Sequence, residues 1–187
     1  MKGQRCFILG SGHSIDSIDL LRLKDENIIG LNSFSFHRNY KELVNSKIGI
    51  KQHVDTPLHK FRNKQIYDDY ITEVDENIHS NVRYFFGIDD YKKNYIDAFK
   101  SRGTENHKNK NYIHCNIRFE KQNKLSDSSF DCSKTVWSFK SSSNFAIFLA
   151  LYQGFEEIYL LGVDHDHMNT DPNSVKAIKE GVLAKDE

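Results

Sequence analysis

Short apolar runs that end at glycine or small polar residues are the clearest pattern in the chain. Residues 6–9 are apolar and end at Gly10-Ser11-Gly12, as in a buried strand that enters a tight turn. Residues 28–31 form a second such run, which ends at Asn32. Between them, Ser14 is a suitable N-cap for a helix with apolar residues at helical spacing. So short a crossover predicts two adjacent parallel strands.

The middle of the chain gives a weaker version of the same pattern. Residues 48–50 predict a third strand, residues 58–74 a helix, and residues 81–86 a further strand. Residues 89–125 are polar and rich in lysine and asparagine. We expect this segment to be a partial lid or a mobile insertion, because it has little apolar surface with which to build a core.

The last third repeats the pattern more sharply. Residues 141–144 (SSSN) offer several N-caps for an apolar helix, which Gly154 ends. That helix is apolar on all sides, so we expect it to be buried. Residues 157–161 predict another buried strand, and Gly162 and Asp164 follow it.

Small or polar residues therefore follow each predicted strand. Parallel strands bring their carboxyl ends to one edge of the sheet, where open α/β folds bind ligands. Their convergence predicts a site for a nucleotide-sized ligand. The candidate binding residues are Gly10, Ser11, Gly12, Ser14, Asn32, Thr56, Ser142, Ser143, Gly162 and Asp164.

Carboxylates and imidazoles alternate directly after the last predicted strand, in Asp164-His165-Asp166-His167. Such a run suits a divalent-metal site, a general base or a polar edge that binds hydroxyl groups, and the pattern alone leaves the three open. The glycine-rich loop after the first strand lacks the third glycine of the dinucleotide fingerprint and the lysine of a P-loop.

Composition removes several classes of protein. The 26 basic residues balance 26 acidic ones, which excludes a protein that wraps nucleic acid. No apolar run approaches the roughly 18 residues of a membrane-spanning helix, and the N-terminus lacks a secretory signal. Three unpatterned cysteines indicate neither a disulfide framework nor a zinc site. We expect a cytoplasmic protein, with attachment to the inner membrane surface left open.

Taken in order, FILGSGHSID, GLNSF, VDTP and SSSNFAIFLALYQGFEEIYLLGVDHDH resemble the bacterial lipooligosaccharide sialyltransferases. They equally resemble the related motility-accessory-factor glycosyltransferases and their pterin-pyrophosphokinase-like relatives. The resemblance covers residues 5–35 and 138–168. It implies an α/β fold, a Rossmann-like parallel sheet with helices on both faces, in a single nucleotide-binding domain over 1–187.

The resemblance also implies roles. Gly10, Ser11 and Gly12 would pack against the nucleotide of a CMP-sugar, and Asn32 would contact its phosphate or ribose. Ser142 and Ser143 would meet nucleotide and sugar, and Gly162 and Asp164 the base and ribose. Thr56, or alternatively Asp55, stands where the family has an asparagine. The function implied is transfer of a sugar from a nucleotide donor to a cell-surface glycan, with no metal or other cofactor; a homo-oligomer stays open.

The segment after Asp164 departs from the family, whose members place tyrosines there and a general-base histidine further downstream. We assign the catalytic role to His165, His167 and Asp166, with one of the histidines as the base. One alternative is a pyrophosphokinase-like enzyme in which Asp164 and Asp166 hold Mg²⁺. Another is a non-catalytic nucleotide-binding domain of a surface-polysaccharide system.

Overall fold

A parallel β-sheet forms the centre of the molecule. The computed structural model describes residues 4–56, 64–89, 94–105, 108–116, 131–137 and 141–164. All strand pairs are parallel, and the strand order is β6-β5-β4-β3-β2-β1-β7. The strands are β1 (Arg5–Leu9), β2 (Asn27–Leu31), β3 (Lys51–Asp55), β4 (Arg83–Ile88), β5 (Lys110–Asn116), β6 (Val136–Trp137) and β7 (Glu157–Leu161). The α-helices are α1 (Tyr40–Asn45), α2 (Lys64–Glu76), α3 (Tyr95–Lys100) and α4 (Ser142–Tyr152), and the 3-10 helices are η1 (His13–Ser17), η2 (Leu20–Leu23) and η3 (Asn32–Phe36).

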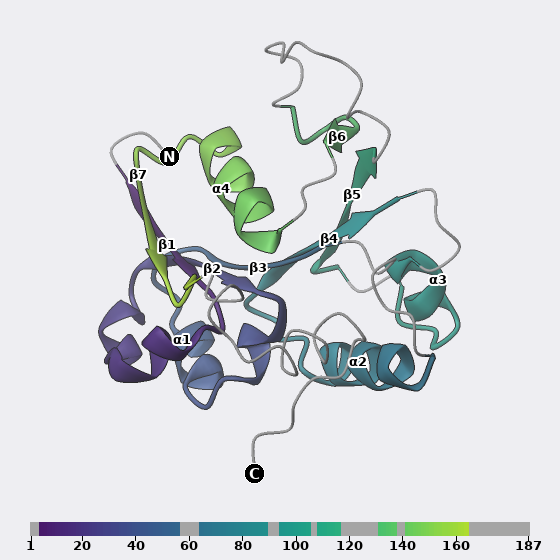
Figure 1. Ribbon diagram of the computed structural model, residues 1–187, viewed down its shortest axis with the longest axis horizontal. Coiled ribbons are helices and arrows are strands. Elements are labelled where there is room, and N and C mark those ends of the chain that lie inside the picture. Colours follow the sequence, from purple (N-terminus) through teal and green to yellow (C-terminus); the bar gives the residue numbers. More distant parts are fainter. Residues whose placement is uncertain are drawn as a thin grey trace, which may run out of the picture.

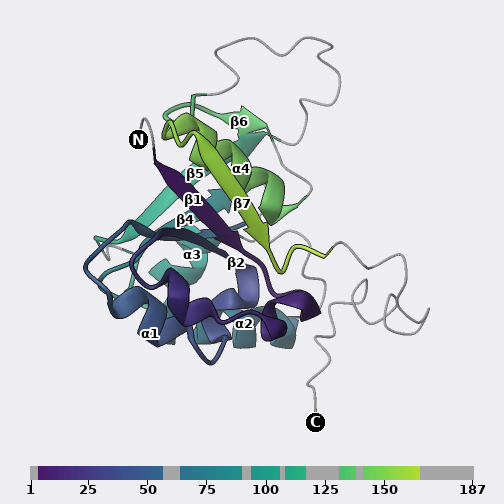
Figure 2. The same ribbon diagram turned by 90° about the vertical axis from the view of Figure 1, so that its left-hand side faces the viewer.

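Helices lie on both faces of the sheet. From β1 to β5 the chain steps outward in one direction, and α1, α2 and α3 lie on one face (Figure 1). It then returns through α4, on the opposite face, to place β7 beside β1 (Figure 2). Right-handed crossovers require this change of face when the direction of travel reverses. The predicted Rossmann-like α/β fold with helices on both faces is confirmed.

Two apolar cores lie on either side of the sheet. Leu9, Ile28 and Tyr84 belong to the core beneath α1, α2 and α3. Ile8, Ile29 and Val54 belong to the core beneath α4. Neighbouring strand residues thus alternate between the two cores, as the pleat requires. In the ranges that the structure describes, no helix has the length and apolar character needed to cross a membrane.

The predicted parallel pair is confirmed, because Ile8 pairs with Ile29 between β1 and β2. The third strand is misplaced. It was predicted at residues 48–50, but Ile48 is 62% exposed and Gly49 turns the chain with a φ of +73°. The strand is Lys51–Asp55 instead, and all five of its residues are buried although most are polar. An apolar pattern cannot reveal such a strand.

The helix predicted to begin at Ser14 is wrong in kind. The segment folds as two short 3-10 helices, η1 and η2, and the N-cap of η1 is Gly12 rather than Ser14. Ile15 and Leu20 are still buried as the apolar spacing indicates. The backbone turns back before a longer helix can form.

The insertion predicted over residues 89–125 is wrong for much of its length. Residues 95–100 form α3, and residues 110–116 form β5, which pairs with β4. Tyr95, Phe99 and Ile113 are buried in the cores. These few bulky side chains anchor the segment in the cores. The average polarity of the segment does not reveal them. Residues 90–93, 106–107 and 117–125 lie outside the described residues.

The last third matches its predicted elements more closely than its predicted burial. Helix α4 has Ser141 as N-cap, and Gly154 follows it with a φ of +79°. However, Leu151 is 53% exposed at the end of α4. Strand β7 was predicted to be buried, but Tyr159 and Leu160 are 44% and 46% exposed because β7 is an edge strand with one neighbour.

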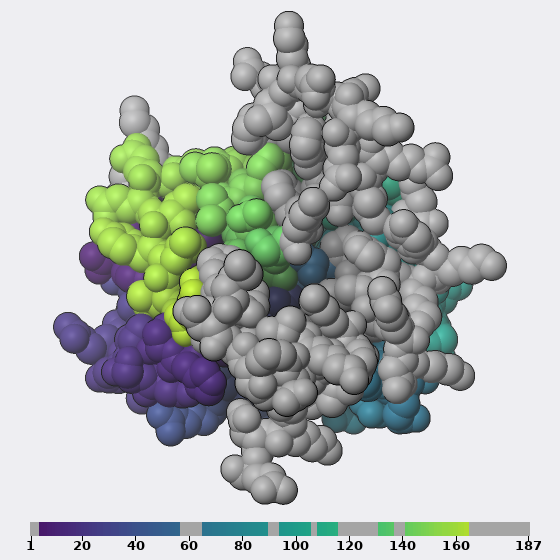
Figure 3. All heavy atoms as spheres, viewed as in Figure 1, coloured from purple at the N-terminus to yellow at the C-terminus, as the bar shows by residue number. Residues whose placement is uncertain are grey.

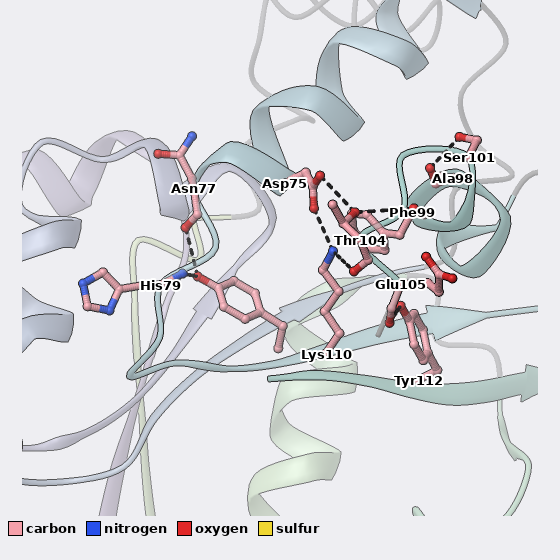
Figure 4. A network of polar contacts seen from close by, with 11 residues as sticks. Asp75, Asn77, His79, Ala98, Phe99, Ser101, Thr104, Glu105, Lys110 and Tyr112 are labelled. Carbon is pink, nitrogen blue, oxygen red and sulfur yellow. Dashed lines mark hydrogen bonds and ion pairs between the residues drawn. The ribbon is translucent and has the colours of Figure 1, made fainter. Parts of the chain in front are cut away.

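A buried ion pair ties β5 to α2 on the face opposite α4 (Figure 4). The Lys110 ammonium lies 2.7 Å from the Asp75 carboxylate and 3.5 Å from the centre of the Phe99 ring. It also donates to the Thr104 carbonyl oxygen, and the Thr104 hydroxyl donates to Asp75. Burial lowers the pKa of Lys110, and the Asp75 hydrogen bond partly offsets this effect.

We expect Asp75→Ala to destabilise the fold by about 3 kcal/mol, because it leaves a buried ammonium without its carboxylate. The measurement is urea unfolding at neutral pH. Asp69→Ala is the matched control on the same helix, since exposed Asp69 accepts only from Gln65 within the helix, and should change stability by less than about 0.5 kcal/mol. Equal losses in both variants would show that the ion pair contributes nothing.

Candidate functional site

The strand order reverses between β1 and β7, which makes the carboxyl ends of these strands the topological switch point of the sheet. In Figure 3 the purple residues near the N-terminus lie beside the yellow-green residues of β7. Ligands of open α/β sheets bind outside the carboxyl ends at such a point. We therefore expect a ligand site at the loops that follow β1 and β7.

These two loops are joined by hydrogen bonds beyond the ends of their strands. The Gly10 amide donates to the Leu161 carbonyl oxygen and the Gly12 amide to that of Gly162, each at 2.8 Å. A Cβ atom on Gly10 would lie 2.2 Å from the Gly162 oxygen, and one on Gly12 would lie 2.5 Å from an Asp164 oxygen. Contact between the two loops therefore accounts for both glycines without a ligand.

Asp164 lies at the start of the first helical turn after β1. One of its carboxylate oxygens accepts from the Ser14 backbone amide at 2.9 Å, and the other accepts from the Ser14 hydroxyl. These bonds, the hydroxyl first, lower the pKa of Asp164. In dinucleotide-binding folds this position holds a phosphate. Here a side-chain carboxylate already provides the anion.

Asn32, Thr56 and Ser142 meet at the same edge of the sheet, one strand further along. The Ser142 hydroxyl donates to Asn32 Oδ1 at 2.6 Å and lies 3.4 Å from the Thr56 hydroxyl. Asn32 follows β2, Thr56 follows β3, and Ser142 begins α4. Three segments far apart in the sequence thus form one polar cluster.

Asn32 holds an uncommon backbone conformation. Its φ is +45°, and it has the only positive φ of a non-glycine residue in the described part of the chain. Asparagine tolerates this region better than other residues with side chains. The conformation turns the chain from β2 into η3 while the side chain stays bonded to Ser142.

The N-terminus of α4 supplies the remaining polar groups of this cluster. The Ser141 hydroxyl accepts from the Asn144 amide as an N-cap and lies 2.9 Å from the Ser143 hydroxyl. Ser142 and Ser143 are both largely buried. The helix N-terminus carries a partial positive charge and unpaired amides, so an anion beside these hydroxyls would be stabilised.

The candidate residues thus fall into two groups at one edge of the sheet. The loop group comprises Gly10, Ser11, Gly12, Ser14, Gly162 and Asp164, and the hydroxyl group comprises Asn32, Thr56, Ser142 and Ser143. Adjacent strands are about 4.8 Å apart, so the loop after β1 and Asn32 after β2 are neighbours. His165, Asp166 and His167 lie outside the described residues, and among those described no group of three side chains is suited to a metal ion.

His53 and Asp55 lie beneath this edge. Asp55 is the alternative to Thr56 at the family's asparagine position, whereas the apolar pattern does not single out His53. Both side chains point toward the core beneath α1, α2 and α3, where they contact Tyr40, Tyr84 and Tyr70. The His53 ring lies 3.0 Å from where a Cβ on Gly30 would lie. Asp55 accepts from the Tyr70 hydroxyl at 2.6 Å and lies 3.8 Å from His53 Nε2. The i, i+2 spacing within a strand is the one signal in the sequence that places them together.

Burial lowers the pKa of His53 to about 4, and a contact with the Asn32 backbone opposes this only in part. The ring packs against Tyr40 and Tyr84. His53 is therefore neutral at physiological pH and acts as part of the support under Asn32 rather than as a charge.

Comparison with known proteins gives no relative, because no family model, curated protein or solved structure matches the chain. The resemblance to sialyltransferases therefore stays a prediction from the motifs.

We expect Gly10→Ala to cost at least about 2 kcal/mol, because the added methyl group would collide with the Gly162 carbonyl and separate the two loops. Gly103→Ala is the control. Gly103 has a φ of +70° but nothing within 4 Å of its Cβ position, so only backbone strain of about 1 kcal/mol applies. Urea unfolding of both variants compares them. A smaller loss for Gly10→Ala would contradict the collision.

The lowered pKa of His53 predicts that the folded state loses stability as the pH falls. Its folded value of about 4 lies below the ordinary 6.5, so the unfolded chain takes up a proton that the folded chain excludes. The stabilisation is complete above pH 6.5 and is lost as pH falls toward 4, by about 3 kcal/mol in total. Chemical unfolding at several pH values should show a steeper loss in the wild type than in His53→Gln. His13→Gln, at an exposed site, should keep the wild-type slope; a His53→Gln slope equal to the wild-type one would refute the assignment.

Proposed function

We propose that this domain binds a nucleotide-activated sugar, a CMP-sugar, and transfers the sugar to a bacterial cell-surface glycan. The donor would lie at the carboxyl edge of the sheet, between the loop after β1 and the N-terminus of α4. The transfer would take place on the cytoplasmic side of the inner membrane, where the activated donor meets a growing glycan. The sialyltransferase-like motifs supply the reaction type, and the geometry of the edge supplies the binding mode.

The polar cluster of Asn32, Thr56 and Ser142 is the observation that carries this proposal. It combines a helix N-terminus, a hydroxyl donor and an asparagine amide at the edge where nucleotides bind in this fold. The corresponding position after β1 already holds the Asp164 carboxylate. A donor phosphate would therefore bind at α4 rather than at the glycine-rich loop.

The same groups suit the chemistry of the transfer. Breaking the bond between sugar and phosphate leaves negative charge on the departing phosphate, which fixed donors stabilise. The amides at the start of α4 and the Asn32 side-chain amide would serve as these donors. The acceptor hydroxyl must lose a proton, and His165 or His167 is the base we assign to that step.

The state of Asp164 favours a transferase over a Mg²⁺-dependent pyrophosphokinase. Both of its oxygens accept from Ser14, and this engagement fixes the carboxylate as part of the loop contact. A magnesium ligand would have to share those oxygens. The Mg²⁺ alternative thus needs other carboxylates near the edge.

Binding measured by calorimetry tests the proposal, with CMP, CTP, UDP and ATP titrated with and without Mg²⁺. We expect CMP to bind without metal. Asn32→Gly should weaken CMP binding about tenfold, because it removes the amide yet keeps the positive φ without strain. Ser101→Ala, in a serine at the end of α3, is the control and should bind CMP as the wild type does.

Three outcomes would reject parts of the proposal. Binding of triphosphates only with Mg²⁺ would favour the pyrophosphokinase. CMP-sugar binding without hydrolysis or transfer to any acceptor would favour a non-catalytic domain. Full turnover in both His165→Ala and His167→Ala would remove the base from the residues we assign.

A further inference from the structure

A cavity lies on the α4 face of the sheet, at the opposite end of α4 from the polar cluster. It has a volume of about 530 Å³ and lies over β4 and β5, between the C-terminal turn of α4 and residues 132–133 before β6. In the described part of the chain, the main contacts of α4 with the sheet are those with β1, β2 and β3. We refer to this cavity as the α4 trough.

The floor of the α4 trough is apolar and its rim is polar. Phe85, Ile113 and Leu149 line it and belong to the core beneath α4. Tyr152, which is 48% exposed, stands at the end of α4 and adds an aromatic ring to the lining. An apolar floor with an aromatic wall suits the face of a small ring compound.

Two cations lie on the rim, and none of the described residues that line the trough carries a carboxylate. Arg83 begins β4 and Lys108 precedes β5, and neither forms an ion pair within the described ranges. The nearby cation Lys110 does not lie on this rim, because it pairs with Asp75 on the opposite face of the sheet. The unbalanced charge at this rim would attract an anionic group.

Side-chain amides are fixed beside these cations. The Asn111 amide donates to the Tyr84 carbonyl oxygen at 3.1 Å, and the Asn109 amide donates to that of Ser80 at 2.6 Å. These bonds hold both side chains in place at the rim. Gln153 and Ser133 add an amide and a hydroxyl to the lining. Such groups are hydrogen-bond partners for several hydroxyls on one ligand.

We propose that the α4 trough binds a monosaccharide unit that carries one anionic group, a carboxylate or a phosphate. Arg83 and Lys108 take the anion, the Asn111 side-chain oxygen accepts from a ring hydroxyl, and the apolar floor takes the carbon face of the ring. A fatty acid would bring no hydroxyl to the Asn111 oxygen, and a neutral sugar would leave the cations without an anionic partner.

This binding is separate from the proposed donor site. The trough residues Leu149 and Tyr152 lie about 10 Å and about 15 Å from Ser142 along the axis of α4. One monosaccharide cannot reach both places. Burial raises the pKa of the Cys132 thiol in the lining to about 12, so this thiol is neutral at physiological pH.

Heteronuclear NMR titration of the full chain with glucuronic acid, glucose 6-phosphate and glucose tests the proposal. At least one charged sugar should bind about tenfold more tightly than glucose, with shifts at Asn111 and Ser133. The affinities of glucuronic acid and glucose 6-phosphate, compared with each other, decide whether the trough prefers a carboxylate or a phosphate. If neither charged sugar binds better than glucose, the proposal is wrong.

The double variant Arg83→Gln/Lys108→Gln should bind the preferred charged sugar no better than glucose. Lys41→Gln, on α1 and on the other face of the sheet, is the matched control and should retain wild-type binding. Asn32→Gly should leave sugar binding intact even where it weakens CMP binding, which separates this site from the proposed function. Wild-type affinity in the double variant would overturn the assignment of the two cations.

Discussion

The close approach of the loops after β1 and β7 is the constraint on which the rest of the structure depends. Parallel pairing of these strands joins the first segment of the chain to the last described one. Two further backbone hydrogen bonds, donated by the Gly10 and Gly12 amides, continue this pairing beyond the strand ends. Side chains on Gly10 or Gly12 would prevent this contact. Because β7 is held there, α4 must cross the opposite face, and its N-terminus is brought to Asn32 and Thr56.

The same constraint separates two functions that one loop combines in dinucleotide-binding folds, namely packing within the fold and binding of a phosphate. The loop after β1 here serves the internal structure, and Asp164 occupies its anion position. In the proposed function, the polar groups that meet the ligand are therefore those at the start of α4. This division explains why the glycine-rich loop resembles a nucleotide-binding motif only in part. It also moves the centre of the proposed donor site from β1 toward β2 and β3.

The sequence alone predicts the parts of this fold in which local pattern and tertiary environment agree. The strand at 28–31 is apolar, and the helix after Ser141 is apolar and has a serine N-cap. Both elements are confirmed. Strand β3 is missed because its buried residues are polar. Segment 94–116 is mistaken for an insertion because a few aromatic side chains, rather than its average composition, anchor it. At the edge of the sheet, the topology explains why Asn32, Thr56 and Ser142 converge, but no local pattern indicates that Asp164 binds Ser14.

Strand β3 is the middle strand of the seven, and it is the most polar of those in the centre. Its side chains gain little from leaving water on their own, because lysine, glutamine, histidine and aspartate all lose hydration when buried. Its place in the sheet is favourable only once the tyrosines and backbone groups that receive these side chains are present. The burial of β3 therefore depends on both halves of the sheet that flank it, and this dependence makes the folding of the sheet cooperative.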